Sequence, residues 1–124
     1  MTDPARRPTF EKSPPELVER FGRVVAERAA LQRRPMFGNP SAFVNGNLAT
    51  GLFADGWFVR LPEDEAAELL AVEGARPFEP MPGRPMRGYV VLPVAIVSDR
   101  TALEAWIDRA IAHAETLPPK PGAG

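Results

Sequence analysis

The side chains with the greatest catalytic potential in this sequence are a group of closely spaced carboxylates: Glu63, Asp64, Glu65 and Glu68. Two carboxylates in different environments can act as a general acid and a general base. The first three, however, directly follow Pro62 and fall in the first turn of a predicted helix, where the helix dipole and water both favour negative charge. We therefore interpret the group as an exposed helix face and predict no catalytic residues.

The single histidine, His113, is the one side chain with an ordinary pKa close to neutral pH. A metal centre needs several converging histidine, cysteine or carboxylate ligands. The chain has no cysteine, and His113 lies beside the apolar stripe predicted for the last helix. We expect a partly exposed helix residue there, and we predict no metal site and no cofactor.

Residues 46–51 have the glycine spacing of a phosphate-binding loop. The Lys-Ser/Thr pair that would follow is missing, and the segment lies between predicted strands instead of before a helix. We reject a phosphate-loop interpretation.

Arginines near two loops could form a small basic patch: Arg33, Arg34, Arg84 and Arg87. If the two loops meet, Phe37 and Tyr89 could stack on bases beside it. The formal net charge of −1, the pI of about 5.9 and the presence of only two lysines argue against this. We expect no nucleic-acid partner and keep weak binding through the arginine patch as an alternative.

Three of the four methionines lie in or beside loops that contain proline: Met36, Met81 and Met86. Each alone is explained by methionine's ability to fill gaps at the open end of a small core. As a group they favour an adaptable apolar surface for a partner. The candidate interaction surface consists of Arg34, Met36, Phe37, Met81, Arg84 and Met86.

The elements that would position this surface begin with a helix. Ser13 is predicted as its N-cap, with Pro14 at the first helical position and Glu16 closing a capping box. Apolar residues then recur at helical spacing until Pro35 ends the pattern. Residues 36–40 are expected to form a loop from this helix into a sheet.

Three antiparallel strands are predicted next, over residues 41–44, 48–53 and 57–61. Asn45-Gly46 and Asp55-Gly56 are typical of type I′ turns, which need positive φ at both central residues. Gly51 indicates a bulge or a close contact with a packed helix.

The second half predicts a helix after Pro62, then a hairpin formed by residues 76–81 and 86–92 around a type II turn at Pro82-Gly83. A last helix follows Ser98 as N-cap, with an apolar stripe from Leu103 to Ala114. The predicted fold class is α+β: a helix, a three-stranded antiparallel meander, a helix, a two-stranded hairpin and a helix. One domain is expected over residues 13–115, with mobile tails at 1–12 and 116–124.

An ordered set of short segments resembles the TfoX/Sxy N-terminal domain family. The segments are RPMFG (34–38), FVNG (43–46), FVRL (58–61), FEPM (78–81), GRPM (83–86) and YVVLP (89–93), followed by residues 103–106. The resemblance covers about residues 17–114. It departs from the family at Asn39-Pro40, where many relatives have glycine followed by a flexible residue, and a proline there disfavours a hinged lid.

The resemblance implies a secretion-chaperone-like sheet covered by helices. The family takes its name from bacterial regulators of DNA-uptake competence, which act with the cyclic-AMP receptor protein and carry a second, helical domain. We expect a stand-alone, single-domain member that is not an enzyme: a cytoplasmic interaction or regulatory module with a protein partner and no membrane contact. An exposed edge strand would also allow a homodimer. The rival interpretation is a small-ligand-binding protein or enzyme with a pocket between sheet and helices, using Arg60, Tyr89 and Trp57.

Overall fold

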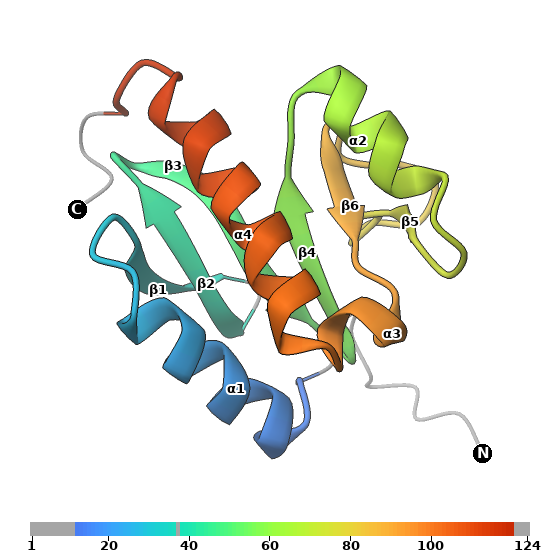
Figure 1. The fold of residues 1–124 in the computed structure, drawn as a ribbon, viewed down its shortest axis with the longest axis horizontal. Helices are drawn as coiled ribbons and strands as arrows, with labels where there is room; N and C mark the ends of the chain where they lie inside the picture. Colours follow the sequence, from blue (N-terminus) through green and yellow to red (C-terminus); the bar gives the residue numbers. More distant parts are fainter. Residues whose placement is uncertain (1–11, 37, 121–124) are drawn as a thin grey trace, which may run out of the picture.

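The computed structural model describes residues 12–36 and 38–120, and these form a six-stranded antiparallel sheet with four helices (Figure 1). The strands are β1 (Gln32–Met36), β2 (Asn39–Val44), β3 (Asn47–Phe53), β4 (Gly56–Arg60), β5 (Arg76–Pro77) and β6 (Tyr89–Val91). The helices are α1 (Pro15–Ala26), α2 (Glu63–Leu70), α3 (Val94–Val97) and α4 (Arg100–Glu115). The strand order is β1-β2-β3-β4-β6-β5, and the predicted α+β class is confirmed.

The predicted loop at residues 36–40 is wrong, because an additional strand, β1, precedes the meander. Met36 is the last residue of β1 and pairs with Asn39, while Pro35 pairs with Pro40. The segment contains two arginines and a proline and has no strand-like alternation. It is a strand because it pairs with β2, and at the edge of a sheet a proline removes no ladder hydrogen bond that a neighbour needs.

The two predicted hairpin turns have different outcomes. Asn45 and Gly46 both have positive φ and connect β2 to β3 as a type I′ turn, as predicted. The prediction of a turn at Asp55-Gly56 is wrong by one residue, since Phe53 pairs with Gly56 and the connecting residues are Ala54 and Asp55. Of these two, only Ala54 has positive φ, which is the pattern of a type II′ turn.

Both predicted serine caps are also wrong. Pro14 precedes the first residue of α1, and the Ser13 amide instead donates to Asn39 Oδ1 at 2.9 Å. Ser98 ends the short helix α3, which was not predicted, and Asp99 caps α4 by accepting from the Ala102 amide at 3.3 Å. Because α3 ends at Ser98, α4 is capped by Asp99 and begins at Arg100, one residue later than a Ser98 cap predicts.

The second hairpin is shorter than predicted. Its strands are only β5 and β6, and Met86 lies before β6 and not inside a strand. The predicted type II turn is present, because Gly83 has positive φ and the Arg84 amide donates to the Met81 carbonyl at 2.9 Å. Residues 78–88 therefore form an irregular loop between the two short strands.

The main core lies between one face of the sheet and the helices, and we call this side the helix-covered face. In Figure 1, α4 crosses in front of β3 and β4, and all four helices contribute side chains to this core. Its buried members include Phe21, Leu52, Trp57, Val59, Leu61, Leu69, Val90, Leu103 and Ile107. Trp57 Nε1 donates to Thr50 Oγ1 at 2.8 Å. The indole N–H is therefore satisfied although it is buried.

A bulge does occur in β3, but not at Gly51. The register of β2 against β3 shifts between Ala42 and Phe43, which pair with Thr50 and Leu48 and leave Ala49 as the additional residue. A Cβ on Gly51 would lie 2.5 Å from Ser41 Oγ and 2.7 Å from Phe58 Cζ. Gly51 therefore allows close contact with side chains of neighbouring strands, not with a helix.

The predicted tails are only partly described: residues 1–11 and 121–124 lie outside the described residues. At the C-terminal end, the Lys120 amide donates to the Asn45 carbonyl at 2.9 Å, and Asn47 Nδ2 donates to the Pro118 carbonyl at 3.0 Å. Within the described part of the chain, no helix has the length and apolarity needed to cross a bilayer.

Candidate interaction face

The opposite side of the sheet carries a second, smaller apolar cluster, and we call this side the helix-free face. Its buried members are Leu48, Phe58, Phe78 and Val91, and no helix residue among those described belongs to it. Half-buried side chains surround these four: Met36, Phe43, Phe53, Met86 and Tyr89. This face is therefore aromatic and methionine-rich, and it is buried only at its centre.

Aromatic contacts hold the centre of the helix-free face together. The rings of Phe58 and Phe78 stack with centroids 4.1 Å apart and planes 12° apart. Phe53 meets Phe78 edge to face at 5.4 Å, and Tyr89 lies 6.0 Å from Phe58. Such ring pairs contribute about 0.5–1.5 kcal/mol each beyond the area they bury. They fix the loop that contains Phe78 onto the sheet.

The structure brings together two of the residues predicted for the interaction surface. Met36 ends β1 and Met86 precedes β6, yet both pack against the helix-free face cluster. Arg34, on β1, lies with its guanidinium carbon 5.2 Å from the centroid of the ring of Phe43, another residue packed against this cluster. These three side chains come from segments far apart in the sequence and share one face.

The other three predicted residues lie differently. Met81 and Arg84 form an isolated bridge at the tip of the 78–88 loop, and Met81 is 54% exposed. Both lie between Phe78 and Met86 in the sequence, but neither belongs to the apolar cluster of the helix-free face. Phe37 lies outside the described residues.

The predicted arginine patch receives no support from the strand order. Arg33 and Arg34 lie on β1 at one edge of the sheet, whereas Arg84 and Arg87 precede β6, next to the opposite edge. Arg87 instead approaches Glu63, with 3.8 Å between Nη2 and Oε2. The two pairs are therefore carried by different ends of the sheet.

The rival pocket of Arg60, Tyr89 and Trp57 does not form. The Arg60 guanidinium lies 5.4 Å from the centroid of the Tyr89 ring on the helix-free face, whereas Trp57 belongs to the core of the helix-covered face. Burial raises the pKa of Tyr89, and the positive charge of Arg60 opposes this rise. Arg60 and Tyr89 thus form a cation–π pair at the rim of the helix-free face.

A groove of about 370 Å³ opens on the helix-free face beside β5. Phe58, Phe78 and Val91 form its apolar wall, and Arg76 and Glu79 supply its charged edge. Phe58 and Phe78 were not among the predicted site residues. The signal was present, since consecutive residues of β4, Trp57, Phe58 and Val59, are all apolar, as in strands that are covered on both faces.

The groups considered for catalysis are accounted for by ordinary surface contacts. Glu63 and Asp64 are exposed in the first turn of α2, as predicted, and Arg109 Nη1 lies 3.9 Å from Glu65 and 3.1 Å from Glu68. Among the described residues, no three histidine or acidic side chains are grouped to hold a metal ion. His113 is half-buried, and burial lowers its pKa.

A family model for the TfoX N-terminal domain matches residues 23–114, from the last turn of α1 almost to the end of α4. This chain belongs to the TfoX N-terminal domain family. The match includes every strand, and so both faces of the sheet lie within the family domain. Comparison with curated proteins found no match, and comparison with solved structures found none.

Proposed function

We propose that this TfoX N-terminal domain is a non-catalytic interaction module with a regulatory role, and that it binds a protein partner through the helix-free face. The observation that carries the proposal is that Met36 and Met86, from segments far apart in the sequence, both pack half-buried against one apolar, largely aromatic cluster. Methionine, aromatic residues and arginine are the types enriched where proteins bind one another. Methionine in particular adapts its shape to a partner.

The charges around the helix-free face indicate the chemistry of the partner. Arg34 and Arg60 lie over Phe43 and Tyr89 at the rim, where their guanidinium groups are within reach of a bound surface. A partner with an apolar centre and acidic side chains around it would complement this arrangement. The family resemblance to regulators of DNA-uptake competence supports a regulatory role.

The test is capture of partners by the tagged chain from a lysate of its own source, with and without nuclease. The test variant combines Met81→Glu with Arg34→Glu, because Met81 is 54% exposed at the tip of the neighbouring 78–88 loop and Arg34 lies over Phe43 of the helix-free face. Leu70→Glu is the matched control, since Leu70 is 40% exposed on α2, on the helix-covered side. We expect a nuclease-resistant partner that is captured at least about tenfold less by Met81→Glu with Arg34→Glu, and normally by Leu70→Glu.

Equal capture by the Met81→Glu/Arg34→Glu double variant and by Leu70→Glu would exclude the helix-free face as the partner surface. Changing Met36 and Met86 to Glu should also weaken capture, but both are half-buried, so their thermal unfolding must be measured alongside. Loss of all partners with nuclease would instead favour weak nucleic-acid binding. Capture of a second copy of the chain would indicate a homodimer, for which the exposed edge at β1 is available.

A further inference from the structure

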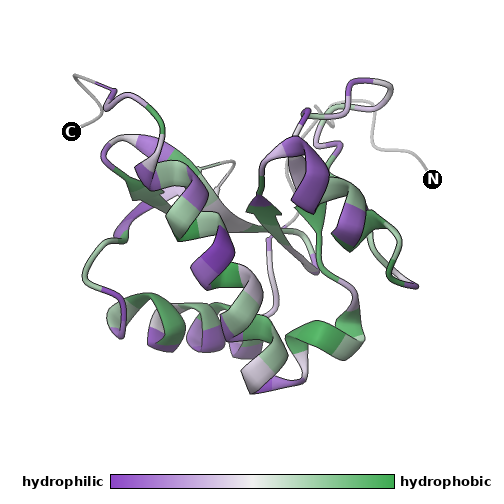
Figure 2. Cartoon of the chain, turned by 45° about the horizontal axis from the view of Figure 1, so that its top comes forward, coloured by the Kyte–Doolittle hydropathy of each residue, from purple (hydrophilic) through white to green (hydrophobic). Residues whose placement is uncertain are grey.

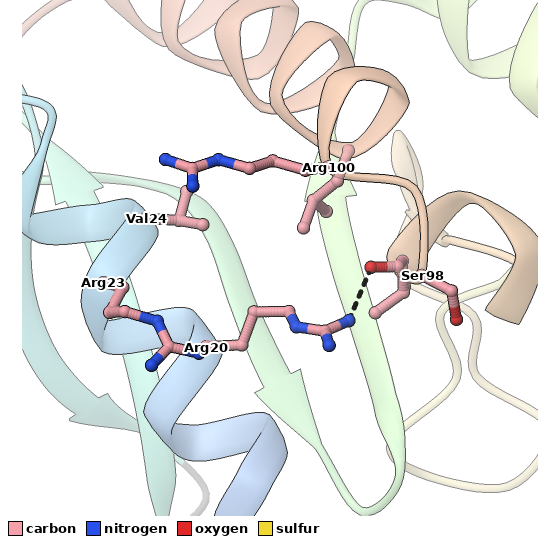
Figure 3. Close-up of a pocket in the computed structure, with 7 residues that line it drawn as sticks. Arg20, Arg23, Val24, Ser98 and Arg100 are labelled. Atoms are coloured by element: carbon pink, nitrogen blue, oxygen red, sulfur yellow. Dashed lines mark hydrogen bonds between the residues drawn. The ribbon is translucent and has the colours of Figure 1, made fainter.

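Two adjoining cavities lie on the helix-covered side of the sheet, where α1 approaches α3 and the start of α4. The first, of about 190 Å³, is lined by three arginines, Arg20, Arg23 and Arg100, over Val24 and Leu103 (Figure 3). The second, of about 320 Å³, is mainly apolar. Arg20, Val97 and Ser98 line both cavities, and Arg20 therefore lies at their junction.

The arginine side of this junction has positive charge that the protein leaves available. In Figure 3, Arg20 reaches from α1 toward the α3–α4 turn, and its Nη1 donates to the Val97 carbonyl at 2.9 Å. This bond fixes the guanidinium but neutralises nothing, and no carboxylate among the described residues forms a salt bridge with it. A guanidinium has five N–H donors, so several stay available to a ligand.

The other two arginines differ in their availability. Arg100 is held by Glu104 at 2.6 Å and by Glu27 at 3.0 Å, so its charge is compensated. Among residues 12–36 and 38–120, the one carboxylate that pairs with Arg23 is Glu19, at 3.9 Å, and both side chains are well exposed, so the pair is weak. Arg20 is therefore the principal anion-binding group of the junction, and Arg23 is its support.

The apolar side is a groove beneath α3. Val94 is 79% exposed, an unusual exposure for a large aliphatic side chain, and it borders the groove with Leu17 and Leu92. Figure 2 shows α3 as a hydrophobic helix at the surface. Glu16 and Asp55 also line this groove, and their negative charge disfavours an anion there. A ligand with one charged end is thus oriented with its apolar part under α3 and its anionic end at Arg20.

We propose that this junction binds a small amphipathic carboxylate, with its aliphatic or aromatic part in the groove below Val94 and its carboxylate on the Arg20 guanidinium. Guanidinium pairs with carboxylate through parallel hydrogen bonds, which suits a planar anion of this kind. The two volumes together fall in the range of small-molecule pockets, about 300–1,000 Å³. This inference does not depend on the proposed protein partner, because the two surfaces lie on opposite sides of the sheet.

The test uses octanoate as the probe, titrated into the full chain by calorimetry and by amide NMR shifts. Octylamine and acetate are the matched controls, since one reverses the charge and the other removes the apolar part. We expect saturable octanoate binding with a Kd of about 1 mM or tighter, and at least about tenfold weaker binding of both controls. The shifted amides should lie in α1, α3 and the first turn of α4.

Two variants examine the two halves of the site. Arg20→Gln should weaken octanoate binding about tenfold or more, whereas Arg87→Gln, at an exposed arginine elsewhere, should not change it. Val94→Ser should also weaken binding, and its side chain is too exposed for the change to disturb folding. Thermal unfolding without ligand verifies that each variant is folded.

No saturable octanoate binding, equal binding of octylamine, or unchanged binding by Arg20→Gln would overturn the proposal. Acetate binding as tightly as octanoate would overturn its apolar half. Met81→Glu should leave octanoate binding unchanged, so that the result is distinguishable from failure of the partner surface.

Discussion

The two faces of this sheet are built from the same strands and differ in what covers them. On the helix-covered face, side chains from four helices bury aliphatic residues together with Phe21 and Trp57. On the helix-free face, the described residues that surround Phe58 and Phe78 come from the 78–88 loop and the strands, and the rim consists of half-buried methionine and aromatic residues. One face is thus covered by helices, whereas the other keeps half-buried apolar side chains, and this second face is where we propose that a partner binds.

The largest expected effect is a difference between the two faces in how much free energy of unfolding is lost when a side chain is truncated. Phe21 is fully buried and lies 5.1 Å from Trp57. Phe21→Ala should therefore lower the free energy of unfolding by about 3–5 kcal/mol. Met86→Ala, at the half-buried rim, should cost about 2 kcal/mol, the lower end of the range for truncating a methionine. Urea unfolding followed by circular dichroism measures both. Equal losses of unfolding free energy would contradict this difference, because the helix-free face would then stabilise the fold as much as the helix-covered core does.

The next effect concerns how tightly the centre of the helix-free face is packed. Gly51→Ala would place a Cβ 2.5 Å from Ser41 Oγ and 2.7 Å from Phe58 Cζ. We expect this change to cost about 1–3 kcal/mol by overpacking. Adding Phe58→Leu should make the double variant more stable than the sum of the single changes predicts, since the smaller side chain yields space. Additive losses in urea unfolding would show that the two positions do not touch.

The positive charge of Arg60 should affect pKa values on both sides of the sheet. Burial raises the pKa of Tyr89 on the helix-free face and lowers the pKa of His113 on α4, and the charge of Arg60 lowers both. Arg60→Gln should therefore raise both pKa values. Tyr89 is the only tyrosine, so tyrosinate absorbance reports it directly, and NMR of the one histidine reports the other. If only one of the two pKa values rises, Arg60 acts on one face alone.

The smallest effect is a pH dependence of stability from the helix-covered side. Burial, with the charge of Arg60, lowers the pKa of His113 in the folded protein below its ordinary value of 6.5. The stability associated with neutral His113 is therefore present above about pH 6.5 and is lost as the pH falls through the folded-state pKa. Between about pH 7.5 and pH 5, the wild type should lose slightly more free energy of unfolding than His113→Gln. Identical pH profiles of unfolding free energy for the two proteins would show that folding does not change the environment of His113.

Local chemistry explains which parts of the fold and of the site could be predicted. Asn45-Gly46 and Pro82-Gly83 specify their turns because few other residues accept the required φ values. The acidic first turn of α2 is predictable for the same reason, since it depends on a few adjacent residues. Where neighbouring elements compete, local signals failed: pairing of Phe53 with Gly56 moved the second turn to Ala54-Asp55.

The α+β class, the family, the order of the main helices and strands, and the residue types on the surface can all be predicted from the amino-acid order alone. The folded structure was needed to see that β1 is a strand, that Met36 and Met86 share one face, and that Arg20 lies at the junction of two cavities. The physical reason is range. Turn and helix signals act over a few residues, whereas strand pairing and side-chain packing join segments tens of residues apart. A pattern in neighbouring residues does not predict which distant segments come into contact.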